Sequence, residues 1–176
     1  MISGASRAAW AAMFACVLTG CATRLPAGAD WVSGRLQVKV EATAATPSRS
    51  VASAFELRGN GDEGELRLNS PLGTRVATAL WSPGSASLAT AEGERRYADL
   101  ESLSRDALGE SLPLRALPDW LHGRPWRGAE SRATAAGFEQ FGWQISLSRL
   151  AEEGLIEAVR NTPPVVTVRA RLEKPE

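Results

Sequence analysis

Short segments in which apolar and polar residues alternate constrain the fold of this 176-residue chain more than any other feature. In the clearest segment, Leu66 and Leu68 alternate with charged or polar neighbours, which is the period-two pattern of a half-buried strand. Val76, Thr78 and Leu80 repeat the pattern and are assigned to the apolar face of a second strand. A Ser-Pro-Leu-Gly segment between the two has the composition of a turn. The sequence therefore predicts a β-hairpin here.

The turn of this hairpin contains an unusual residue. Leu72 stands between Pro71 and Gly73, where a polar residue is the usual choice. An apolar side chain exposed at the tip of a turn is typical of a contact with a membrane or a partner. The alternative is that Leu72 folds back onto the core, and the turn by itself favours this alternative.

The same alternation recurs along most of the chain. It predicts strands with the following inward-facing residues: Leu36, Val38 and Val40; Val51, Ser53, Phe55 and Leu57; Ala86, Leu88 and Thr90; Trp143, Ile145 and Leu147; and Val166, Val168, Ala170 and Leu172. Another strand is expected over residues 155–160, and loops are expected over residues 127–137 and 151–154. The many predicted strands make the fold class mainly β. Because a sheet of such strands has one apolar face to cover, we expect a curved antiparallel sheet that forms an incomplete, half-open barrel.

A helical insertion interrupts the strands. Asp99 can cap a helix that ends near Gly109, and this helix carries Leu100, Leu103, Ala107 and Leu108 at helical spacing. One or two further short helices, interrupted at Pro118, are expected to present an apolar face made of Leu114, Leu117, Trp120 and Leu121. These short helices predict a lid over the open sheet. The tryptophans and leucines beneath it could fill a core or line a cavity for an acyl chain.

The N-terminus has the features of a lipoprotein signal. A short apolar run over residues 8–19 follows Arg7. The segment Leu18-Thr19-Gly20-Cys21, which overlaps the end of this run, resembles a bacterial lipobox. The resemblance implies that Cys21 is lipidated after cleavage, with Ala22 directing the protein to the outer membrane. An ordinary signal peptide with a chance cysteine is the alternative. The expected organisation is a signal peptide (1–20), a lipidated tether (21–30) and a single domain (31–176).

Composition argues against several classes of function. The 20 basic and 20 acidic residues give a net charge of zero, which argues against nucleic acid as a partner. Cys16 leaves with the signal and Cys21 carries lipid, so no disulfide or cysteine-based metal site is expected. His122, the one histidine, is interpreted as a solvated loop residue. Without a nucleophile motif or metal-ligand spacing, the sequence predicts no catalytic residue, no metal and no cofactor.

Several motifs together resemble one family. They are the lipobox, Trp31 with Gly34-Arg35-Leu36, and the segments 64–68, 70–74, 81–84, 112–114, 117–125 and 142–143. In their order and residues they are similar to the LolB family of outer-membrane lipoprotein receptors. One departure is that residues 169–176 lack the terminal tryptophan expected of that family.

The resemblance implies both a fold and a function. The fold would be an incomplete barrel with a lid of short helices over an apolar cavity. The protein would accept acylated client lipoproteins from a periplasmic, LolA-like carrier and insert them into the inner leaflet of the outer membrane. Pro71, Leu72 and Gly73 would form the loop that meets outer-membrane phospholipid. Cavity and lid would be made by Leu36, Val38, Phe55, Leu66, Leu68, Leu103, Leu114, Leu117, Trp120, Leu121, Trp143 and Ile145 of a monomer.

Two other functions remain as alternatives. A lipid-anchored periplasmic scaffold, or partner-binding domain, would have a filled core and would transfer no lipid. A cell-envelope hydrolase would require clustered titratable groups in a cleft, which the sequence does not indicate.

Overall fold

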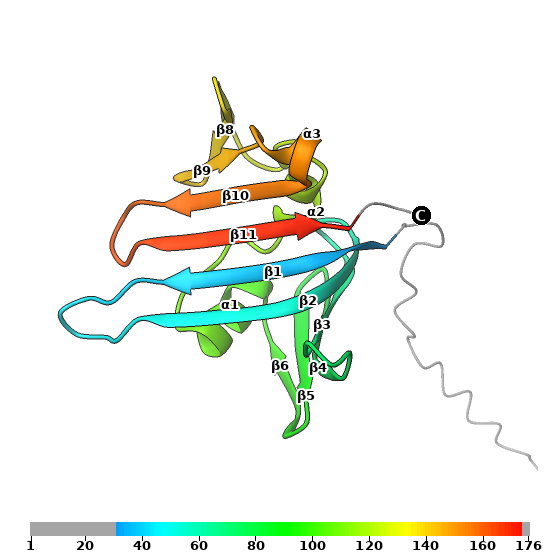
Figure 1. The fold of residues 1–176 in the computed structure, drawn as a ribbon. Helices are drawn as coiled ribbons and strands as arrows, with labels where there is room; N and C mark the ends of the chain where they lie inside the picture. Colours follow the sequence, from blue (N-terminus) through cyan, green and yellow to red (C-terminus); the bar gives the residue numbers. More distant parts are fainter. Residues whose placement is uncertain (1–30, 174–176) are drawn as a thin grey trace, which may run out of the picture.

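One antiparallel sheet organises the residues that the computed structural model describes, 31–173 (Figure 1). Its strands are β1 (Val32–Val40), β2 (Arg49–Gly59), β3 (Gly64–Asn69), β4 (Arg75–Ser82), β5 (Ser85–Thr90), β6 (Gly93–Tyr97), β7 (Ser131–Thr134), β8 (Gly137–Gln140), β9 (Trp143–Ser146), β10 (Leu155–Arg160) and β11 (Val166–Leu172). The helices are α1 (Leu100–Leu108), α2 (Leu117–Leu121) and α3 (Leu150–Glu153). The predicted signal, tether and lipid-attachment residue Cys21 lie outside the described residues.

The strand order explains how the two halves of the chain form one sheet. The order is β6-β5-β4-β3-β2-β1-β11-β10-β9-β8-β7. At its centre, Val38 of β1 lies opposite Val51 of β2 on one side and Val168 of β11 on the other. Within the described residues, the edge strands β6 and β7 do not pair with each other, so the sheet stays open. The prediction of a curved antiparallel sheet in an incomplete barrel is confirmed.

Strands formed at all the predicted places, but the face assigned to β4 was wrong. Ala79 lies opposite Leu66 of β3, and residues directly opposite each other share a face. Ala79 and Trp81 are therefore buried, whereas Val76 and Leu80 are 46% and 44% exposed. Since successive side chains point to opposite faces, a shift of one residue reverses the whole strand.

The helical insertion is close to the prediction. The Asp99 side chain accepts a hydrogen bond from the Ser102 backbone N–H at 2.7 Å, and α1 ends where the Gly109 N–H bonds the Arg105 carbonyl. The interruption expected at Pro118 was wrong. Pro118 lies in the first turn of α2, where a backbone N–H has no helical partner to lose.

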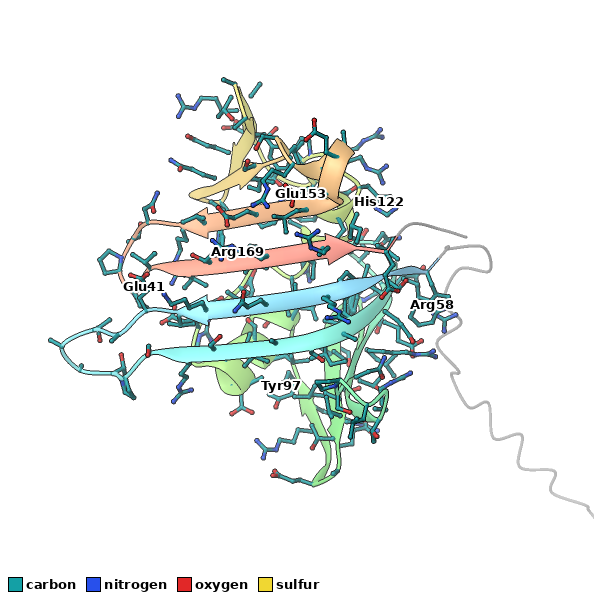
Figure 2. All side chains as sticks on the ribbon, in the orientation of Figure 1. Glu41, Arg58, Tyr97, His122, Glu153 and Arg169 are labelled. Atoms are coloured by element: carbon teal, nitrogen blue, oxygen red, sulfur yellow. The ribbon has the colours of Figure 1, made fainter. Side chains whose placement is uncertain are left out.

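Two of the expected loops contain regular structure. Residues 127–137 include β7, and residues 151–154 overlap α3. All four residues of β7 are exposed, so the strand has no buried face to produce an alternating pattern. His122 lies after α2 and is exposed, as expected, with its Nδ1 atom 2.7 Å from the Pro118 carbonyl oxygen (Figure 2).

The apolar core lies on the side of the sheet where α1 and α2 pack (Figure 1). Helix α1 contacts β5 and β6, and α2 contacts β2. Phe55 of β2 and Val166 of β11 are almost completely buried in it. In the described part of the chain, none of the helices has the length and apolar character that crossing a membrane requires.

Candidate functional site

The predicted cavity and lid residues come together in one apolar cluster. Nine of the twelve are buried, and the other three, Leu36, Leu68 and Leu114, are partly buried against them. The nine buried residues are Val38, Phe55, Leu66, Leu103, Leu117, Trp120, Leu121, Trp143 and Ile145. They come from both halves of the sheet and from α1 and α2. The cluster is therefore a contact between the lid and the inner face of the sheet.

Trp120 of α2 packs against aromatic residues of β8 and β9. It is 4% exposed, and its ring lies 6.1 Å from that of Trp143 and 6.4 Å, edge-on, from that of Phe138. Its indole Nε1–H donates a hydrogen bond of 2.9 Å to the Gln140 side-chain oxygen. The one polar atom of this large apolar side chain is thus satisfied inside the core.

Gln140 joins the lid to β8 through its other hydrogen bonds as well. Its Oε1 accepts the Trp126 backbone N–H at 3.0 Å, and its Nε2 donates to the carbonyls of Trp126 and Ala129 at 2.7 and 3.0 Å. The side chain is 3% exposed. Sequence reasoning missed this residue, although the alternation from Phe138 places a polar side chain on the apolar face.

Ser104 makes a second polar connection within the lid. This fully buried residue of α1 accepts the Leu112 backbone N–H at 2.9 Å and donates to the Glu101 carbonyl at 3.0 Å. It therefore fixes the chain between α1 and α2 to the first helix. Sequence reasoning missed Ser104 too, because a serine within a helix gives no sign of its partner.

The loop between β3 and β4 holds Leu72 away from the core. Leu72 is 94% exposed. Ser70 closes the loop, since its N–H donates to the Thr74 carbonyl at 2.8 Å and its carbonyl accepts the Gly73 N–H at 2.9 Å. Gly73 has φ +81°, a conformation that favours glycine. The alternative in which Leu72 folds back onto the core does not occur in this structure.

A network of charged residues covers the outer face of β2 and β3. Glu65 is 6% exposed and accepts hydrogen bonds from Arg67 and, at 2.7 Å, from Arg58. Both guanidinium groups lie over the Trp31 ring, 4.2 and 4.6 Å from its centre. Burial favours a higher pKa for Glu65, but the hydrogen bonds and charges of Arg67 and Arg58 outweigh it and lower the pKa below 4.5.

This lowered pKa predicts that Glu65 stabilises the fold at neutral pH and less in acid. Near pH 4.5 the unfolded chain binds more protons at this carboxyl than the folded chain does. The contribution is therefore complete above that pH and is lost as the pH falls through the folded pKa. Glu65→Gln should lower the free energy of unfolding at about pH 7 more than at about pH 3, as measured by urea denaturation. An equal loss at both pH values, or the same pH dependence in a Glu94→Gln control, would contradict this role.

In residues 31–173, no group of three or more His, Cys, Asp or Glu side chains is arranged to hold a metal ion.

Comparison with known proteins identifies the family. The family model described as "Outer membrane lipoprotein LolB" matches residues 30–170. A relative from Chromobacterium violaceum, named Outer-membrane lipoprotein LolB, is 38% identical over 151 residues, covering 78% of this chain and 80% of the relative. Relatives of the same name from Bordetella pertussis and Bordetella petrii are 36% and 32% identical, covering 78% and 82% of this chain and 76% and 80% of their own lengths. The chain thus belongs to the LolB family of outer membrane lipoproteins.

Proposed function

We propose that this chain is an outer-membrane lipoprotein receptor that accepts acylated lipoproteins from a periplasmic carrier and inserts them into the inner leaflet of the outer membrane. Membership of the LolB family supports the receptor function and the location. The observation that carries the proposal is the loop bearing Leu72, because it presents an apolar side chain that is 94% exposed beside a sheet with a helical lid. The transfer of an apolar side chain of this size from water into a bilayer lowers the free energy.

The acyl chains of a client would bind between the lid and the sheet. The twelve residues of the apolar cluster offer only apolar surface there, as an acyl-chain site requires. Because most of them are buried, α2 must move away from β8 and β9 before a chain can enter. The hydrogen bonds between Gln140, Trp120 and Trp126 would break and re-form during this motion.

Transfer would proceed without a catalytic step. Acyl chains would pass from carrier to receptor to bilayer, driven by the burial of apolar surface at about 0.8 kcal/mol per methylene. Lipidated Cys21 would hold the receptor at the outer membrane, since two or more acyl chains anchor stably where one is marginal.

A transfer assay tests this function. Residues 31–173 contain the whole sheet and its core, so a chain that begins at residue 22 keeps the fold. A purified carrier loaded with an acylated lipoprotein is mixed with this chain, and phospholipid vesicles are then added. We expect uptake followed by delivery, with neither step for a client that lacks acyl chains. If the folded chain takes up no client, the receptor function is wrong and a partner-binding scaffold is the better description.

A further inference from the structure

A groove of about 650 Å³ lies beside the Leu72 loop. Its lining includes Pro71 and Gly73 of this loop and residues of β1, β2 and β11. Three arginines line it, namely Arg35, Arg169 and Arg171. Figure 2 shows Arg169 on the face of the sheet opposite the helices. The groove therefore opens on the outer face of the sheet, and Leu36 is the one residue of the apolar cluster that also lines it.

The charges around the groove leave a small positive excess. Arg169 is paired with Glu157. Glu153 pairs with both Arg171, at 3.2 Å, and Arg149, at 2.6 Å. Glu173 is the acidic residue of the groove lining. Arg35 is exposed, and within residues 31–173 it makes neither an ion pair nor a side-chain hydrogen bond. When the paired residues are included, four arginines lie near three glutamates, and among the described residues Arg35 is the arginine of the groove without an ion pair.

The position of the groove points to a phospholipid. If Leu72 enters the acyl region of the bilayer, the base of its loop and the adjacent groove lie at the level of the headgroups. Each phospholipid headgroup carries a phosphate, and a guanidinium group can donate two parallel hydrogen bonds to phosphate oxygens. We propose that the groove binds the phosphate of a membrane phospholipid, with Arg35 as its principal contact. This inference rests on the proposed function, because it takes Leu72 as the membrane-inserting residue.

The proposal predicts a specific loss of membrane binding. Removing one arginine at an anionic surface lowers binding roughly fivefold, and the effect weakens as salt rises. Arg35→Gln should therefore lower binding roughly fivefold on vesicles of phosphatidylethanolamine that contain phosphatidylglycerol. Arg35→Lys should retain more of the binding because it keeps the charge. Arg35 makes neither an ion pair nor a side-chain hydrogen bond within residues 31–173, so neither change should alter thermal stability.

The experiment compares vesicle co-sedimentation of the chain from residue 22 with that of these variants. Arg96→Gln is the matched control, since Arg96 lies on edge strand β6 with a side chain that is 84% exposed. We expect this control to bind as the unchanged chain does. An equal loss for Arg96→Gln would reduce the effect to total charge and overturn the proposal. Binding of inorganic phosphate without vesicles would overturn it as well, because the groove would then recognise a soluble anion.

The transfer assay separates this inference from the receptor function. If the unchanged chain takes up and delivers a client while Arg35→Gln binds vesicles normally, only the phospholipid site is wrong. If Arg35→Gln binds vesicles normally but no longer accepts a client from the carrier, the groove is a protein-docking surface instead. If the unchanged chain takes up no client, the receptor function fails whatever the vesicles show.

Discussion

Replacing Leu72 with glutamate should stop the delivery of client lipoproteins to vesicles while leaving their uptake from the carrier intact. Full burial of a leucine side chain in an apolar medium contributes about 1.5–3 kcal/mol, which corresponds to a change in vesicle binding of roughly 10- to 150-fold. A glutamate adds the cost of placing a charge in the bilayer. Because Leu72 is 94% exposed and outside the core, the substitution should not change the unfolding temperature.

Matched substitutions distinguish membrane insertion from a general loss of apolar surface. Leu72→Gln and Leu80→Gln remove the same side chain without adding charge, and Leu80 is also exposed, at 44%, on the outer face of β4. We expect delivery to fall for Leu72→Gln and to remain for Leu80→Gln. Normal delivery by Leu72→Glu would remove the loop from the mechanism. Loss of uptake in the same variant would instead indicate that Leu72 contacts the carrier.

The features predicted correctly from the sequence depend on neighbouring residues. The start and end of α1 follow from Asp99 and Gly109, whose capping contacts reach only a few residues along the chain. The alternation in β1 and β11 was equally clear, because charged or polar residues occupy one face and apolar residues the other. In both cases the signal is local, so no knowledge of the tertiary structure is needed.

The errors arise where contacts distant in sequence decide the outcome. In β4 both faces carry apolar residues, with Val76 and Leu80 on one and Ala79 and Trp81 on the other. Only the pairing with β3 determines which set is buried. Strand β7 is a similar case. Its four exposed residues show no alternation that would indicate a strand, and the strand forms through pairing with β8.

The candidate site shows the same division. Its apolar residues could be predicted because burial follows from pattern. The exposure of Leu72 could not be predicted from the turn alone, which favoured a leucine folded back onto the core. The polar contacts of the lid could not be predicted. Gln140 bonds Trp120 and Trp126, which lie 20 and 14 residues earlier in the chain and reach it only through the folding of the whole insertion.

Gln140→Leu is the change expected to destabilise the lid most among the polar residues. Leucine leaves the Trp120 indole N–H and the Trp126 backbone N–H without their acceptor in the core. Each buried donor left without a partner costs about 1–3 kcal/mol. Because the bond of the Trp126 N–H is only part-buried and counts at about 1 kcal/mol, the free energy of unfolding should fall by roughly 2–4 kcal/mol. The unfolding temperature should drop by roughly 6–12 °C, measured by circular dichroism.

Gln144→Leu is the control, because Gln144 is an exposed residue of neighbouring β9 and should tolerate the same substitution. Gln140→Leu should also increase proteolysis between α1 and β7, because α2 and the segment after it lose their attachment to β8. In the transfer assay the same variant should take up clients faster and retain them less well, because a looser lid favours both entry and exit. Equal stability of Gln140→Leu and Gln144→Leu would show that these hydrogen bonds do not hold the lid to the sheet.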